Sequence, residues 1–70
     1  MLFIELTNDA PIETIYINPE YIASMSHDEY RGRTEVTVVG DGAYDSIIET
    51  PDEIITKIKE ARLKQALGIK

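Results

Sequence analysis

The sequence predicts an α+β fold: a small, mostly antiparallel β-sheet of four to five strands, followed by one C-terminal α-helix packed on one face of the sheet. Two observations carry this prediction. Within residues 1–49, short segments alternate apolar and polar side chains, and residues 51–67 form one capped amphipathic pattern. The 70 residues are expected to make one domain, residues 1–70, with a marginal core, because a chain this short buries only about 60% of its unfolded surface.

The first two strands follow from period-2 alternation and turn chemistry. Apolar residues recur at every second position over 2–6, and Asn8 to Pro11 then punctuates the chain as a turn. Residues 12–17 are rich in β-branched side chains, which favour a second strand. Pro19 ends that strand because proline has no N–H for the ladder.

The later strands are expected at residues 21–26, 34–39 and 43–49. An alternative stays open at 19–21, where the chain could start one helical turn. Residues 27–33 are polar, contain a glycine and predict a flexible hairpin loop. The glycines of 40–42 supply the positive-φ positions of a tight connection.

The helix start is the most specific local signal. Thr50 and Glu53 have the spacing of a capping box, and Pro51 occupies the first helical position, where its missing N–H has no consequence. Gly68 is placed to follow the helix end. At about 100° per residue, one apolar stripe is expected to face the sheet. Its members are Ile54, Ile55, Ile58, Ala61 and Gln65.

Leu63 and Leu67 lie on the opposite side of the predicted helix, one turn apart. Two interpretations remain open. The pair could be half shielded by long lysine and arginine stems, as exposed leucines often are. It could instead form a contact with a partner or a second copy, which a marginal core would favour. Both residues are therefore candidate interface residues.

Charge and composition exclude several functional classes. The net charge is −6, and residues 1–50 hold ten acids against two arginines, so direct nucleic-acid binding is not expected. There is no cysteine and one histidine, so we expect no disulfide, structural metal or cofactor. The apolar runs are too short to cross a membrane and the start does not resemble a signal peptide, which together predict a cytoplasmic protein.

No familiar catalytic motif is present, and the chain is not expected to be an enzyme. His27, Asp28 and Glu29 are contiguous, so their side chains should diverge rather than converge on a base or a metal. Gly40 to Gly42 is better explained as a hairpin than as an anion nest, because Asp41 would repel phosphate.

Two groups of residues that contain tyrosine are candidates for binding. Tyr30, Arg31 and Arg33 form a candidate anion or nucleotide contact in an otherwise acidic region, although a solvated loop has the same composition. Tyr16 and Tyr44 are candidate interface residues if they share an exposed sheet face; core packing is the alternative.

The order of these features resembles one known family. The segments that carry the resemblance are Tyr16 to Ile22 (YINPEYI), Thr37 to Gly42 (TVVGDG) and Glu49 to Ile58 (ETPDEIITKI). They are similar to the FlbD-like small proteins of flagellar operons, phages and prophages. The resemblance covers nearly the whole chain and implies a regulatory or uncharacterised role with no catalytic residues. The 27–33 loop and the extension through Leu63 and Leu67 depart from the family pattern.

Two functional hypotheses follow. The first is a non-catalytic bacterial or phage accessory protein that acts through protein–protein contact, as a homo-oligomer. The alternative is a phage-encoded inhibitor of a host enzyme or defence system, acting by acidic mimicry of nucleic acid or by sequestering a nucleotide signal. The acidic strands motivate the mimicry, and Tyr30, Arg31 and Arg33 motivate the sequestration.

Overall fold

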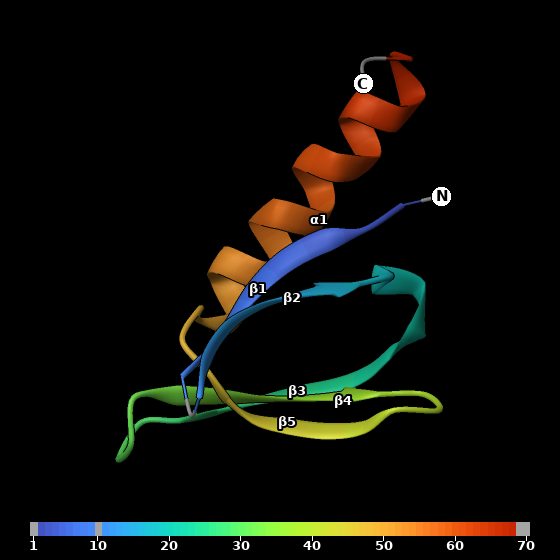
Figure 1. Ribbon diagram of the computed structural model, residues 1–70. Helices are drawn as coiled ribbons and strands as arrows, with labels where there is room; N and C mark the ends of the chain where they lie inside the picture. The colour runs from blue at the N-terminus through green and yellow to red at the C-terminus, as the bar shows by residue number, and fades with distance from the viewer. Residues whose placement is uncertain (1, 10, 69–70) are drawn as a thin grey trace.

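The fold combines one five-stranded antiparallel sheet with one helix, which confirms the predicted α+β class. A computed structural model describes residues 2–9 and 11–68 (Figure 1). The elements are β1 (Ile4–Asp9), β2 (Ile12–Ile17), the 3₁₀ turn η1 (Pro19–Tyr21), β3 (Ile22–Asp28), β4 (Arg33–Val38), β5 (Gly42–Ile47) and α1 (Pro51–Ala66).

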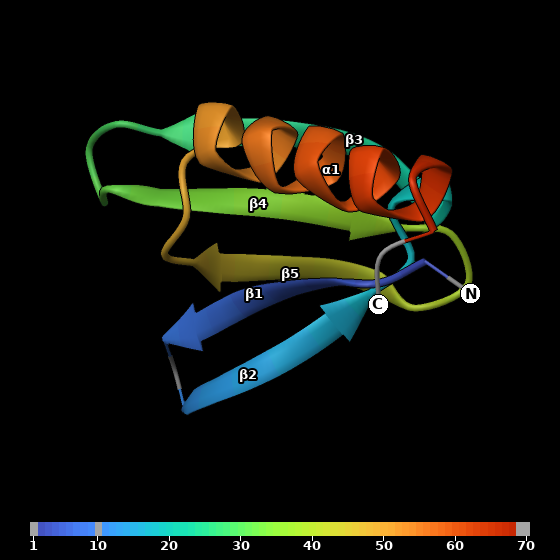
Figure 2. The ribbon, with the colours of Figure 1, turned by 90° about the horizontal axis from the view of Figure 1, so that it is seen from above.

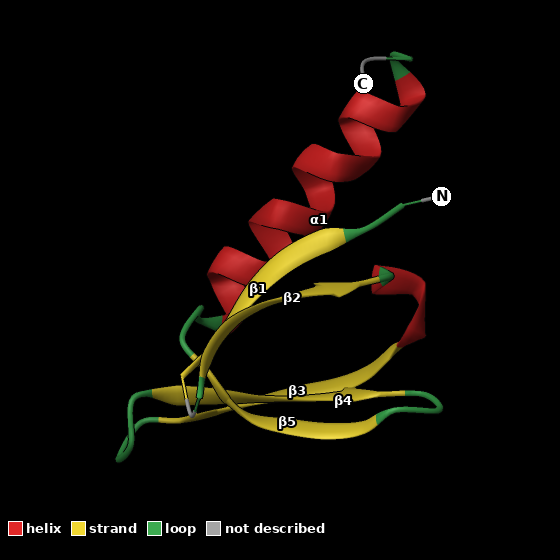
Figure 3. Cartoon of the chain, in the orientation of Figure 1, coloured by secondary structure: helices red, strands yellow, loops and turns green. Residues whose placement is uncertain are grey.

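The sheet has the strand order β2-β1-β5-β4-β3, so a hairpin of β1 and β2 adjoins a meander of β3, β4 and β5. The two parts meet at β1 and β5, where the only aligned pair in the described chain is Asn8 with Ile47. The backbone N–H of Ile48 also donates to the carbonyl of Thr7 at 3.0 Å. The sheet therefore bends at this junction, and Figures 1 and 3 show the hairpin and the meander as separate sections beside α1.

The core lies between the inner face of the sheet and the first half of α1. Its buried members are Ile4, Leu6, Ile17, Val36, Val38, Ile47 and Ile54. Thr34 is the one polar side chain buried among the described residues, and its Oγ1 lies 3.2 Å from Nδ1 of His27. Ile54 is the fully buried residue that α1 supplies, and Ile58 and Ala61 pack against the same core, so these three side chains attach the helix to the sheet.

The predicted helix boundaries are confirmed to within one residue. Thr50 Oγ1 accepts from the N–H of Glu53 at 3.2 Å, and the Glu53 carboxylate accepts from the N–H of Thr50 at 3.0 Å, so the capping box is complete. The helix ends at Ala66, and Gly68 follows with a φ of +73°, a conformation that glycine adopts without strain.

The hairpin predicted over 27–33 is confirmed, but its turn is shorter than expected and covers only residues 29–32. The strand β3 continues to Asp28, whose carboxylate accepts from the N–H groups of Tyr30 and Arg31 at 3.0 and 3.2 Å. Gly32, with a φ of +67°, completes a tight turn into β4. The open alternative at 19–21 is also settled, because these residues form η1 and not the start of a strand.

The stripe expected to face the sheet is narrower than predicted. Ile54 is fully buried, and Ile58 and Ala61 are half-buried against the core. Ile55 is 40% exposed because it lies a quarter turn away from Ile54, and Gln65 is exposed because the helix has left the sheet by that point. Within the described residues, no helix is long and apolar enough to span a membrane.

Candidate functional site

The last part of α1 projects beyond the sheet. Every residue from Arg62 to Gly68 is exposed, whereas Ile54, Ile58 and Ala61 earlier in the helix pack on the core. Figure 1 shows this end of the helix extending past the strands. We call residues 62–67 the free end of α1. Within it, Leu63 is 60% exposed and Leu67 is 64% exposed, so the structure places both candidate interface leucines in solvent.

The free end of α1 differs from the sheet in charge. Arg62 and Lys64 lie in it, and Glu60 lies two positions before Arg62. Lys64 also lines a shallow groove between α1 and β1, together with Phe3 and Ala61. The two leucines therefore form an apolar stripe between basic side chains, on a molecule whose net charge is −6.

The first half of α1 is held by Glu49, which sequence reasoning did not single out. Its carboxylate accepts from the N–H of Thr7 at 2.8 Å and from the Thr7 hydroxyl at 3.0 Å. The same carboxylate lies 4.0 Å from Nζ of Lys57. These contacts connect β1, the segment before α1 and the helix itself. A carboxylate just before a capping box was the available signal, but its partner lies 42 positions away in the chain.

Tyr16 and Tyr44 lie on opposite faces of the sheet. Tyr44 packs against the core, whereas Tyr16 is 63% exposed and pairs with the exposed Glu5 on the outer face of β1 and β2. The two tyrosines therefore do not form one recognition surface. Other apolar side chains are exposed on the hairpin with Tyr16: Ile12 at 78% and Phe3 at 50%.

Of the candidate anion residues of the β3–β4 turn, Arg31 and Arg33 line one hollow, but Tyr30 does not. Arg33 is engaged by Asp9, whose Oδ2 accepts from Nε at 2.9 Å and from Nη2 at 2.6 Å. Arg31 reaches the Ser46 hydroxyl at 3.4 Å, and Tyr30 is completely exposed. Arg33 thus joins the tip of β1 to β4 and is not available as a free cation.

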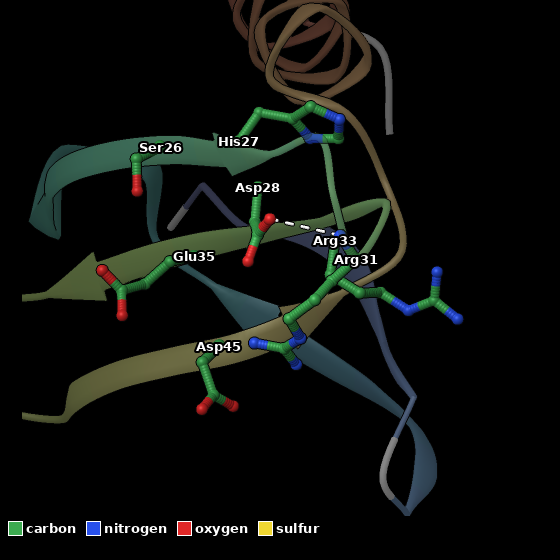
Figure 4. Close-up of a pocket in the computed structure, with 7 residues that line it drawn as sticks. All are labelled: Ser26, His27, Asp28, Arg31, Arg33, Glu35 and Asp45. Atoms are coloured by element: carbon green, nitrogen blue, oxygen red, sulfur yellow. Dashed lines mark hydrogen bonds between the residues drawn. The ribbon is translucent and has the colours of Figure 1, made fainter.

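A hollow of about 230 Å³ lies on the outer face of the meander, beside this turn. Its lining combines the carboxylates of Asp28, Glu35 and Asp45 with the side chains of Arg31 and Arg33. Figure 4 shows His27 pointing to the other side of the sheet from the carboxylates. In the described part of the chain, no three histidine or carboxylate side chains gather as metal ligands would. The three carboxylates outnumber the two arginines of this hollow, and Arg33 is already engaged by Asp9, so the local charge disfavours a phosphate.

Hydrogen bonding changes the pKa of Glu53. The pKa of Glu53 is lowered, chiefly because its carboxylate accepts from the Thr50 backbone and contacts the Thr50 side chain; nearby Lys57 adds to the effect. This group stabilises the start of α1 and lies away from the free end of the helix.

No protein-family model matches the chain, and no curated protein or solved structure shows significant similarity to it. The resemblance to FlbD-like proteins stays a prediction from the sequence.

Proposed function

We propose that this chain is a non-catalytic protein that acts through protein–protein contact, with the free end of α1 as its contact surface and a second copy as its partner. The exposure of Leu63 and Leu67, on a stretch of helix with no buried residue, carries the proposal. A placement as a bacterial or phage accessory protein of the cytoplasm belongs to the same proposal and rests on the resemblance to FlbD-like proteins.

Helical turns without tertiary contacts are marginal in water, because most helical stability in proteins comes from packing of an apolar face. Burying a leucine fully contributes about 1.5–3 kcal/mol. Leu63 and Leu67 are one turn apart, so two free ends related by a two-fold axis can pack antiparallel, each covering the leucines of the other. A second copy would thus add apolar burial that a 70-residue chain cannot supply alone.

Sedimentation velocity of the wild type and of Leu63→Glu/Leu67→Glu tests this proposal. We expect the double variant to sediment with a lower mass, because carboxylates replace both apolar contacts. High salt should not weaken wild-type association, since Arg62 and Lys64 of the two copies would repel each other across this contact.

The matched control is Ser24→Glu/Ala43→Glu, which adds the same charges at exposed positions of the sheet. It should retain the wild-type mass. Equal masses for the wild type and the leucine variant would refute self-association through the free end of α1.

The alternative is a phage-encoded inhibitor. One observation favours its mimicry form: Asp28, Glu35 and Asp45 line one hollow and outnumber the two arginines beside them. The nucleotide-sequestering form is less well supported, because Asp9 already engages Arg33. Calorimetric titration with ATP and with inorganic phosphate tests it. Heat of binding that Arg31→Ala removes would support sequestration, and no heat with either ligand would count against it.

A further inference from the structure

The two edge strands of the sheet differ in the regularity of their pairing and in whether the helix packs beside them. At one edge, β3 has a register shift between Ile22 and Ser24, and α1 packs beside it. At the other edge, β2 pairs with β1 over six consecutive positions without a bulge. Figure 2 shows β2 at the border of the sheet farthest from α1. Bulges and covering helices protect sheet edges from pairing, and β2 has neither.

The backbone groups at the outer edge of β2 can be assigned from the contacts of Thr7. Its N–H donates to Glu49 and its carbonyl accepts from Ile48, so both groups point away from β2. Backbone groups alternate in direction along an antiparallel strand. Thr14, which lies opposite Thr7, therefore turns its N–H and C=O away from β1, as do Ile12 and Tyr16.

We propose that β2 of a second copy pairs antiparallel with this edge, across a two-fold axis at Thr14. In this register Thr14 faces the second copy's Thr14, and Ile12 faces the second copy's Tyr16. Each such pair exchanges two hydrogen bonds, so every outward N–H and C=O of the strand gains a partner. A shift by two residues would leave one of these residues without a partner, so the strand is most complementary to itself in this one register.

The side chains favour the same register. Ile12 is 78% exposed and Tyr16 is 63% exposed, and a β-branched residue opposite an aromatic one is a stabilising cross-strand pair. Glu13, the only charged residue of β2, faces the second copy's Ile15, so no like charges lie directly opposite one another.

This contact is separate from the free end of α1, and neither proposal depends on the other. If both contacts form, each chain carries two different two-fold interfaces. Two such interfaces build either a closed tetramer or an open chain of subunits.

Cysteine cross-linking tests the register directly, because the chain has no native cysteine. Thr14→Cys lies on the proposed axis and should form a covalent dimer on mild oxidation. Ile12→Cys should not pair with itself, but a mixture of Ile12→Cys and Tyr16→Cys should cross-link. We expect both favoured reactions to be at least about ten-fold faster than self-linking of Ile12→Cys, owing to the high effective concentration across the axis.

A second pair of variants tests the backbone contact. Thr14→Pro removes an N–H that faces away from β1, a position where a strand tolerates proline, so circular dichroism should show a retained fold while association through β2 is lost. Thr14→Val keeps the N–H and should associate as the wild type does.

Equal rates for Thr14→Cys and Ile12→Cys, or unchanged association of Thr14→Pro, would overturn the proposal. The pattern should persist when Leu63→Glu/Leu67→Glu is added. If the wild type and Leu63→Glu/Leu67→Glu had equal masses while the cysteine variants cross-linked as expected, only the contact through α1 would be refuted. The reverse result would refute only the pairing of β2.

Discussion

The two halves of α1 differ in their role: the first half packs on the sheet and is part of the fold, whereas the second half is exposed and extends beyond it. The first half carries the capping box, the buried Ile54 and the Glu49 contacts to β1. The free end of α1 has a helical sequence, a glycine after its end and no buried residue. Changes in the first half should therefore alter stability, whereas changes in the free end should alter association.

The largest effect is expected at the one core residue that α1 supplies. Ile54→Ala should lower the free energy of unfolding by about 2–5 kcal/mol, because it removes a fully buried side chain and leaves a cavity. Urea denaturation measures the loss. Ile55→Ala is the matched control, and an equal loss there would contradict the distinction between these neighbouring isoleucines.

Glu49→Ala should lower the free energy of unfolding by about 1–3 kcal/mol, because the N–H and hydroxyl of Thr7 both lose a charged acceptor. Glu49→Gln keeps a carbonyl oxygen for the N–H and should lose less. Denaturation of both variants separates the charge from the hydrogen bonds. No loss in either variant would show that Glu49 does not hold the start of α1 to β1.

The capping box should give a smaller effect that depends on pH. Thr50→Ala should lower stability by about 0.5–2 kcal/mol at neutral pH, because the N–H of Glu53 loses its acceptor.

Since folding lowers the pKa of Glu53, its stabilising effect is fully present above the ordinary glutamate value and is lost as the pH falls through the lower value of the folded state. Glu53→Gln, followed by thermal denaturation from neutral to acid pH, should approach the wild type in acid. A constant difference at every pH would contradict this account.

The free end of α1 should show the smallest effect on stability. Under conditions where the chain is monomeric, Leu63→Ala should change the free energy of unfolding by less than about 0.5 kcal/mol, as exposed positions usually do. Its amides should exchange with solvent faster than those around Ile54. Protection equal to that around Ile54 in the monomer would contradict the exposure of the free end.

The helix could be predicted from its capping residues, and most strands could be predicted from the alternation of apolar and polar side chains. The capping box involves Thr50, Pro51 and Glu53 alone, so its position could be predicted to the residue. The hairpin after β3 was predicted, but its short turn was not, because the key group is a single carboxylate, Asp28, within a run of polar residues that also suits a longer loop.

Non-local relationships could not be predicted. Nothing in the sequence places β1 beside β5, and the outward direction of Tyr16 and the inward direction of Tyr44 depend on which strand faces each of them. Arg33 suggested an anion contact because its partner, Asp9, belongs to a distant strand. Leu63 and Leu67 could be singled out because helical periodicity alone places them opposite the stripe that faces the sheet.

The narrow junction between β1 and β5 also has a consequence for the order of folding. The β1–β2 hairpin and the β3–β4–β5 meander each join neighbours in the sequence, so each can form from local contacts. The bond from Thr7 to Glu49 closes a loop of 42 positions and has to await both parts. We expect the β1–β5 junction, and the docking of α1 over it, to form late in folding. The rate-limiting step would then be the association of the hairpin with the meander.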